Sequence, residues 1–258
     1  MQVRQPKTLY DSNLQHSWFS SCVQGSMKWL GEMMDKQEKA WEIYYRLLDC
    51  YGEPSWRPDR VAVDELIVTI LSANTNDVNS GRAFDELIQR YNHDWDAIRT
   101  APLDDIKDAI RVAGMYTQKA PRIVAALERI KNEQGIYNLD HVAEMSVDDA
   151  LAYLTDFPGV GHKTASIVLL FLFGMPTFPV DTHIQRISQR TGISTRRAAP
   201  EKVKADWEAL LPGKTYFRLH VSLITHGRAR CRARRPQCDG CPLLSLCDYG
   251  NQTKAWAN

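Results

Sequence analysis

The sequence predicts an all-α protein. Apolar residues recur at helical spacing along most of the 258 residues, alternating β patterns are almost absent, and no repeat of fixed period is present. A composition of 44% hydrophobic and 24% charged residues, with 14 Gly and 12 Pro, is typical of globular chains and excludes collagen-like and largely disordered classes. The length is sufficient for one large domain or two modest ones.

The sequence predicts ten helices. Their apolar positions lie three or four residues apart, which places them on one face of each helix. The segments are 40–50, 63–73, 77–91, 104–112, 120–132, 146–155, 163–173, 182–191, 201–211 and 216–226. The clearest helix start is at Ser146, because a capping side chain is followed there by acidic residues in the first turn.

Charge is distributed unevenly along the chain. The net charge of the whole sequence is +1, which by itself argues against a nucleic-acid partner. Residues 1–156 hold 17 basic and 25 acidic residues, a balance of −8, whereas residues 157–238 hold 14 basic and 4 acidic residues, a balance of +10. A basic block of this kind indicates a surface for a polyanion, and a merely solvated basic face is the alternative.

No segment of the sequence is long and apolar enough to cross a membrane. The longest apolar stretch, 167–180, is interrupted by Gly174, Pro176 and Pro179, and it is shorter than the roughly 20 residues that a span needs. The N-terminus lacks the basic-then-apolar layout of a secretion signal. We therefore expect a soluble, cytoplasmic monomer without a membrane partner, associated with the nucleoid if the source is bacterial.

Four cysteines lie near the C-terminus at spacings of six, two and five residues: Cys231, Cys238, Cys241 and Cys247. Two disulfides are typical of small secreted domains, so four thiolates around a metal centre are the better interpretation. Zinc sites usually pair two short Cys knuckles and only one such pair is present, which favours a [4Fe–4S] cluster and leaves zinc as the alternative. The two remaining cysteines, Cys22 and Cys50, are interpreted as ordinary thiols.

Arginines gather in and beside the first interval of this cysteine loop: Arg230, Arg232, Arg234 and Arg235. No acidic residue lies among them. A metal-bound loop could present these side chains to phosphate oxygens, with which Arg forms bidentate contacts. A loop whose arginines serve only solubility is the alternative interpretation.

A glycine-rich turn joins two expected helices in the sequence Phe-Pro-Gly-Val-Gly-His-Lys-Thr-Ala, residues 157–165. Gly159 and Gly161 allow backbone conformations in which successive N–H groups point outward at a helix N-terminus. Such a turn can bind a phosphate without reading sequence, although most Gly-x-Gly turns are simply tight turns. It is neither a Walker loop nor a dinucleotide fingerprint, because no strand precedes it and the glycine spacing differs. Lys163, just after the turn, is by itself a candidate phosphate contact.

An isolated acid, Asp181, follows 18 residues after Lys163. It ends an apolar stretch, where desolvation of a carboxylate costs free energy unless the group has a structural or functional role. Because it directly precedes the helix expected at 182–191, a helix cap is the simplest interpretation, and a functional carboxylate is the alternative. His183 is interpreted as a packed or hydrogen-bonding histidine rather than a metal ligand.

Together these features resemble the endonuclease III family of helix–hairpin–helix DNA glycosylases over residues 60–249. The resemblance is carried by Leu71–Asp77, Gly114–Ala120, Phe157–Ala165, Val180–His183 and the cysteine loop. It implies two helical domains with a DNA groove between them. One is a six-helix domain with the helix–hairpin–helix motif, 55–175; the other joins both chain ends, 1–54 and 176–258, around a [4Fe–4S] cluster held by the loop 231–247.

The resemblance also implies the roles of two residues. Lys163 matches the nucleophile and Asp181 the essential carboxylate. In this chemistry a neutral Lys amine attacks C1′, releases the base and leaves a Schiff base, after which β-elimination nicks the strand 3′ to the lesion. A carboxylate supports the positive charge that develops at C1′. Because a free Lys amine is protonated at neutral pH, the site has to favour the neutral amine by desolvation or neighbouring positive charge.

A base must leave the stack to be reached, and the resemblance implies residues for this step. Asn74 matches the residue that fills the vacated space, and Met115 matches the wedge in the opposite strand. Relatives usually carry Gln and Leu at these two positions, so lesion preference could differ. The other implied DNA contacts are Gly159, Val160, Gly161, Thr164, His183, Arg186, Arg230, Arg232, Arg234 and Arg235.

We therefore expect a bifunctional DNA glycosylase/AP lyase of base excision repair that removes oxidised or ring-saturated pyrimidines from damaged double-stranded DNA. A mismatch glycosylase acting on G·T or uracil is one alternative, against which Lys163 argues because such relatives generally carry another residue there. A non-enzymatic iron–sulfur protein that binds DNA or senses redox state is the other, and it would leave Lys163 and Asp181 without a task.

Overall fold

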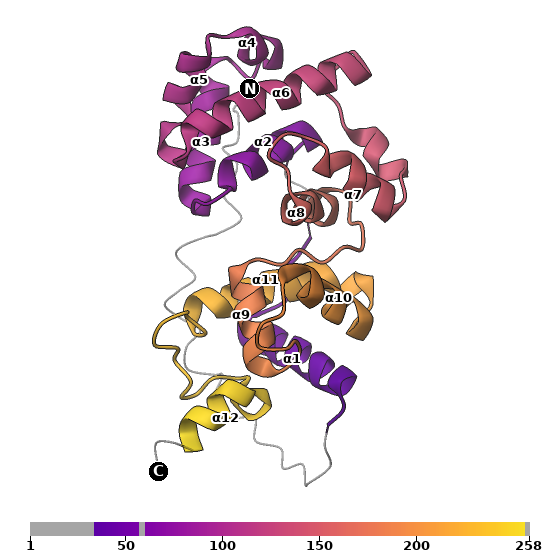
Figure 1. Cartoon of the computed structure of the whole chain (residues 1–258), viewed down its shortest axis with the longest axis vertical. Coiled ribbons are helices and arrows are strands. Elements are labelled where there is room, and N and C mark those ends of the chain that lie inside the picture. Colours follow the sequence, from indigo (N-terminus) through magenta and orange to yellow (C-terminus); the bar gives the residue numbers. More distant parts are fainter. Residues whose placement is uncertain (1–33, 57–59, 256–258) are drawn as a thin grey trace. The chain divides into compact units, whose positions relative to one another are not determined.

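The computed structural model describes residues 34–56 and 60–255 (Figure 1). Every regular element within these ranges is a helix, which confirms the predicted all-α fold. The chain divides into two compact units: unit 1 comprises Met1–Arg57 with Pro176–Asn258, and unit 2 comprises Pro58–Met175. Among the described residues, no helix combines the length and the apolar character that crossing a membrane requires.

Unit 2 is built around α2, which is buried on most of its surface. Leu66, Ile67, Ile70 and Leu71 are at most 1% exposed, and α2 packs against α3, α6 and α8. A short helix that is apolar nearly all round forms the centre of a core rather than its edge. The α-helices of unit 2 are α2 (Ala62–Ser72), α3 (Asp77–Arg90), α4 (Trp95–Thr100), α5 (Leu103–Ala109), α6 (Tyr116–Gln134), α7 (Val147–Thr155) and α8 (His162–Leu172).

One helix of unit 2 is not predicted by the sequence pattern. The six residues of α4 are too few to show an apolar period, and Asp94 starts this helix by accepting hydrogen bonds from the amides of Asp96 and Ala97 at 2.9 and 3.1 Å. With α4, the described part of unit 2 has seven α-helices rather than the expected six. The predicted start of α7 is confirmed, because the Asp149 amide donates to Ser146 Oγ at 3.1 Å.

Unit 1 combines segments from both ends of the chain. Helix α1 (Lys36–Tyr51) packs against α10 and α11, which lie in the C-terminal segment. A capping box formed by Asp35 and Glu38 starts α1 four residues earlier than its apolar period predicts. The other helices of unit 1 are α9 (Thr182–Thr191), α10 (Pro200–Leu210), α11 (Tyr216–Ala229) and α12 (Asp248–Ala255).

Aromatic residues fill the centre of unit 1. Trp207 is fully buried, and its indole N–H donates to Ser188 Oγ at 2.7 Å, which ties α10 to α9. Phe178, on the segment that precedes α9, packs against Trp207 with ring centroids 6.0 Å apart. This packing fixes the chain just before Asp181.

The interpretation of Cys50 as an ordinary thiol is wrong. Cys50, near the end of α1, is disulfide-bonded. Distance from other cysteines along the sequence does not show which residues meet in space. The corresponding interpretation of Cys22 falls outside the described residues.

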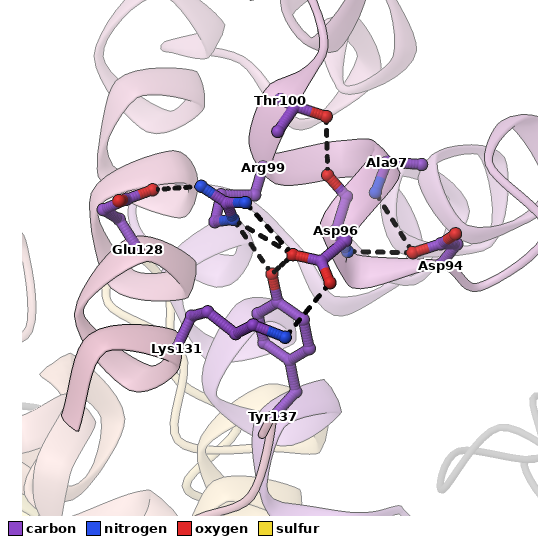
Figure 2. Close-up of polar contacts among 8 residues, drawn as sticks. All are labelled: Asp94, Asp96, Ala97, Arg99, Thr100, Glu128, Lys131 and Tyr137. Carbon is purple, nitrogen blue, oxygen red and sulfur yellow. Dashed lines mark hydrogen bonds and ion pairs between the residues drawn. The ribbon is translucent and has the colours of Figure 1, made fainter. Parts of the chain in front are cut away.

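A network of ion pairs and hydrogen bonds ties α4 to α6 and to the turn that follows α6 (Figure 2). Asp96 accepts from Tyr137 Oη at 2.6 Å, from Lys131 Nζ at 3.2 Å and from Arg99 Nε at 3.2 Å. Arg99 also donates to Glu128 at 2.7 Å. These donors, the Tyr137 hydroxyl foremost, lower the pKa of Asp96 to about 2.

This network predicts how acid affects stability. The pKa of Asp96 in the folded chain lies below the unfolded value of about 3.9, so the stability that Asp96 contributes is complete above that value and is lost as the pH falls toward about 2. We expect Asp96→Asn to lower the urea midpoint at pH 7, and the gap between variant and wild type to narrow below about pH 4.

The matched control is Asp85→Asn, at an exposed acid on α3 whose side chain forms no hydrogen bond or ion pair within the described residues. Its urea midpoint should follow the wild type at every pH. A difference in urea midpoint between Asp96→Asn and the wild type that stays constant down to pH 3 would show that the Asp96 network does not contribute this stability.

Candidate active site

The glycine-rich turn between α7 and α8 is a tight hairpin. The Val160 amide donates to the Phe157 carbonyl at 3.0 Å, and both side chains are buried. Gly159 has a φ of +85°, and a Cβ there would lie 2.4 Å from Cδ of Arg122, so a larger residue would strain the backbone and displace that arginine. Gly161 begins α8 without a side-chain cap, which leaves the first amides of the helix open to an outside acceptor.

Lys163 lies in the first turn of α8, directly after the hairpin. Its side chain is exposed, and no hydrogen bond or ion pair within the described residues engages it. Thr164, the next residue, is half-buried. Ala165 and Val168 anchor the other face of α8 in the core of unit 2, so the free amine is carried by a rigid element.

Asn74 and Met115 lie next to each other although 41 residues separate them in sequence. The side-chain amide of Asn74 donates to Met115 Sδ at 3.6 Å. Both residues have left-handed backbones, with φ of +54° and +49°, which non-glycine residues rarely adopt. Both are exposed, Met115 by 40%. Strained, exposed residues of this kind are typical of functional positions.

Asp181 is the N-cap of α9, so the simplest interpretation of this residue is confirmed. Its Oδ1 accepts a hydrogen bond from the Ile184 amide at 2.8 Å. The side chain is half-buried, and the carboxylate has a second oxygen beyond the one used in the cap. A capping role therefore leaves acceptor capacity for a second task.

His183 and Arg186 contact each other on α9. Arg186 Nη2 lies 3.0 Å from His183 Nδ1, and because Arg is only a donor, Nδ1 must be the acceptor. Burial lowers the pKa of His183, which agrees with a neutral ring. Arg186 also donates to the carbonyls of Cys231 and Gly227 at 2.8 and 3.2 Å, so much of its guanidinium holds the start of the cysteine loop. Their DNA contacts stay predictions.

The four cysteines of the loop line one cavity between α9, the end of α11 and the start of α12. All four are half-buried, and none of them is in a disulfide bond. Within the described residues, no three His, Cys, Asp or Glu side chains are close enough together to hold one metal ion. Burial raises the pKa of the Cys241 thiol to about 11 and also raises that of Cys247. At neutral pH burial therefore favours the protonated form of these two thiols, unless a positive charge is bound beside them.

A hydrogen-bonded chain leads from α1 to this cavity. Tyr51 Oη lies 2.9 Å from His226 Nδ1, and His226 Nε2 lies 3.7 Å from Cys241 Sγ. Burial raises the pKa of Tyr51, so its hydroxyl keeps the proton that it donates to the ring. Burial, with Arg230 and Arg186 nearby, lowers the pKa of His226 to about 4. The neutral ring thus presents its remaining N–H to the sulfur of Cys241.

Sequence reasoning missed Arg190, which holds the cysteine loop in place. Its guanidinium donates to the carbonyls of Arg232 and Ala233 at 2.8 and 3.1 Å and to Cys231 Sγ at 3.2 Å. It also lies over the ring of Tyr249, 4.6 Å from the centroid. The only available signal is its position four residues after Arg186, which places the two arginines on one face of α9.

The predicted DNA-contacting arginines of the loop differ in their surroundings. Arg230 is half-buried and donates to the Asp239 carbonyl at 3.3 Å. Arg232, Arg234 and Arg235 are exposed, and within the described part of the chain no carboxylate pairs with their side chains. Three exposed guanidinium groups without a carboxylate partner have the chemistry to bind phosphate oxygens, and their DNA contacts stay predictions.

The predicted residues form a separate group in each unit. The hairpin, Lys163, Asn74 and Met115 belong to unit 2, whereas Asp181 and the cysteine loop belong to unit 1.

Comparison with known proteins places this arrangement in a family. The family model of HhH-GPD superfamily base excision DNA repair proteins matches residues 67–212. Endonuclease III of Rickettsia felis is 36% identical over 187 residues, which cover 72% of this chain and 82% of that protein. Endonuclease III of Synechocystis sp. is 33% identical over 220 residues, covering 84% and 95%. The chain belongs to the endonuclease III family.

A solved structure of the endonuclease III family supports the same conclusion. The trapped endonuclease III–DNA covalent intermediate has a TM-score of 0.73 to this chain, with 27% identity, and the match covers 86% of this chain and 100% of that one. The predicted family and the predicted class of enzyme, a DNA glycosylase/lyase of base excision repair, are confirmed. The roles of individual residues stay predictions.

Proposed function

We propose that this member of the endonuclease III family removes oxidised or ring-saturated pyrimidines from double-stranded DNA and then nicks the strand through a Schiff base on Lys163. The observation that carries the proposal is the exposed, unpaired Lys163 amine on the rigid first turn of α8, directly after a hairpin with open amides. The amides and the positive end of α8 suit a DNA phosphate, which would bring the neighbouring sugar to the amine.

In this proposal the Lys163 nitrogen bonds to C1′ as the bond from C1′ to the damaged base breaks, and the base leaves with a proton that the attacking amine gives up. The ring then opens to a protonated imine, loss of a proton from C2′ drives β-elimination, and the 3′ phosphate leaves. The Asp181 carboxylate supports the positive charge that develops at C1′. Its second oxygen, free of the helix cap, suits this role.

We further propose that the four loop cysteines hold a [4Fe–4S] cluster. Family membership supports it. So does the cavity, which all four cysteines line together. Bound there, the cluster would act as a structural centre that carries the arginine loop, while the chemistry at C1′ is left to the protein side chains.

Loss of one cysteine tests the cluster. We expect wild-type protein to be brown and to contain about four iron atoms per chain. Cys241→Ser should lose the broad visible absorbance and bind DNA more weakly, because Arg186 and Arg190 alone then hold the arginine loop. Gln237→Ala, an exposed change in the same loop, should keep both properties. A colourless wild type with stoichiometric zinc would contradict the proposal.

The adjacent pair of Asn74 and Met115 is proposed to fill the space of the extruded base and to part the opposite strand. Asn74→Ala should reduce activity on a damaged duplex by roughly tenfold, an increase of about 1.4 kcal/mol in the barrier, and should reduce cleavage of a pre-formed abasic site less. Asn74→Gly, which accepts the left-handed backbone, separates loss of the side chain from backbone strain.

Asn132→Ala on the exposed side of α6 is the control for the Asn74 variants and should leave both activities unchanged. Equal losses on the two substrates for Asn74→Ala and Asn74→Gly would remove Asn74 from base extrusion.

The substrate class is tested by a panel of duplexes that carry thymine glycol, dihydrouracil, a G·T mismatch, uracil or an abasic site. We expect base release and nicking on the first two and nicking on the last. Activity confined to G·T or uracil would establish the mismatch glycosylase instead. Binding without any strand nicking would establish a non-enzymatic DNA-binding protein. The proposal includes a cytoplasmic monomer that is associated with the nucleoid if the cell is bacterial.

A further inference from the structure

One lysine of unit 2 is enclosed in the core. Lys119, in the first turn of α6, is 1% exposed. Its ammonium donates to the Leu71 carbonyl at 2.7 Å and to the Ala113 carbonyl at 2.9 Å. Burial, with Arg122 nearby, lowers the pKa of Lys119. No carboxylate in the described part of the chain pairs with the group, so two backbone carbonyls take the place of a counter-ion.

Both carbonyls lie where a helix ends. Leu71 is the penultimate residue of α2, and Ala113 is the last residue of the 3-10 helix Arg111–Ala113. Carbonyls in the last turn of a helix lack an intrahelical donor, and positive charge is favourable there. Lys119 therefore caps two helix ends at once and joins them through one atom.

After each of these helix ends the chain forms a short turn. Each turn contains one exposed residue whose backbone is left-handed. Asn74 follows Leu71 by three residues, and Met115 follows Ala113 by two. The Lys119 amide also donates to the Met115 carbonyl at 3.0 Å, so the lysine belongs to the turn that begins at Met115. Lys119 thus binds the backbone that leads into both members of the pair.

We infer that Lys119 is a positioning residue for lesion recognition. By joining the end of α2 to the end of the 3-10 helix, it holds Asn74 and Met115 in contact before DNA binds, so that the two side chains enter the duplex as one assembled element. This inference rests on the proposed roles of Asn74 and Met115. Without the ammonium the two turns separate, and Asn74 and Met115 no longer form the rigid pair that base extrusion needs. The position of Lys163 on α8 does not change.

The test measures base extrusion without relying on bond cleavage. A duplex carries 2-aminopurine beside a thymine glycol whose 2′-fluoro substituent blocks base release, and extrusion raises the 2-aminopurine fluorescence. Lys119→Met keeps the length and the burial but removes both hydrogen bonds. We expect it to lose most of the fluorescence rise and to lower cleavage of an unmodified thymine-glycol duplex on the order of 10²-fold, with a smaller loss at a pre-formed abasic site.

Two controls separate positioning from general destabilisation. Leu127→Ala truncates a fully buried side chain of the same helix away from both turns, and Lys107→Met removes a surface lysine of unit 2. Leu127→Ala should lower the melting temperature at least as much as Lys119→Met and keep the fluorescence rise, whereas Lys107→Met should change neither.

The outcomes distinguish this inference from the proposed function. A full fluorescence rise with Lys119→Met, or an equal loss with Leu127→Ala, overturns the positioning role and leaves the proposed function intact. No rise with wild-type protein overturns base extrusion by the Asn74 and Met115 pair, and the positioning role with it. A loss confined to Lys119→Met supports the inference.

Discussion

Replacement of Lys163 by Ala is expected to abolish strand nicking and borohydride-trapped complexes, because no amine remains to form the Schiff base. Folding should be unaffected, since the side chain is exposed and forms no hydrogen bond or ion pair within the described residues. The measurement is single-turnover base release and nicking on a thymine-glycol duplex, with the melting temperature as a check on folding.

The matched control for Lys163→Ala is Lys107→Ala, which removes another lysine from the surface of unit 2. It should nick DNA at the wild-type rate. A trapped complex that persists in Lys163→Ala would show that another nitrogen is the nucleophile.

Replacement of Asp181 by Asn separates the two roles of this residue. Asn caps helices about as well as Asp, so the hydrogen bond from the Ile184 amide should persist with only a small change in the free energy of unfolding. The negative charge is lost, however. We expect base release to slow by a factor on the order of 10²–10³, the cost of removing one group that stabilises transition-state charge. Single-turnover kinetics and thermal unfolding measure the two effects.

Asp35→Asn is the control for Asp181→Asn, because it makes the same chemical change at the N-cap of α1. It should leave base release unchanged. Asp181→Ala should add a stability loss of about 1 kcal/mol to the kinetic defect, since the cap is then missing. If Asp181→Asn kept the wild-type rate and only Asp181→Ala slowed the reaction, Asp181 would be a helix cap alone.

Periodicity was sufficient to predict most of the fold. Helices with a long apolar face, such as α2, α3 and α9, begin and end within one or two residues of their expected positions. Helix α4 was missed because it is short, and α12 because most of its residues are polar. The start of α1 was misplaced because a capping box, rather than an apolar residue, determines it.

The candidate site was only partly predictable. Lys163, Asp181 and the cysteines are found by motif because their spacing along the chain is short or characteristic. Lys119 and Arg190 are not, because their partners are backbone carbonyls that lie far away in the sequence or carry no residue signature. Every residue has a backbone carbonyl that can accept a hydrogen bond. Only the folded structure therefore shows to which carbonyls the side chains of Lys119 and Arg190 donate.

In the proposed reaction the Lys163 nitrogen becomes covalently bound to C1′ of the damaged nucleotide. The direct measurement is borohydride reduction of wild-type protein on a thymine-glycol duplex, followed by proteolysis and mass spectrometry of the cross-linked peptide. We expect one stable adduct, located on Lys163. Base release without any adduct, or an adduct on another residue, would contradict it.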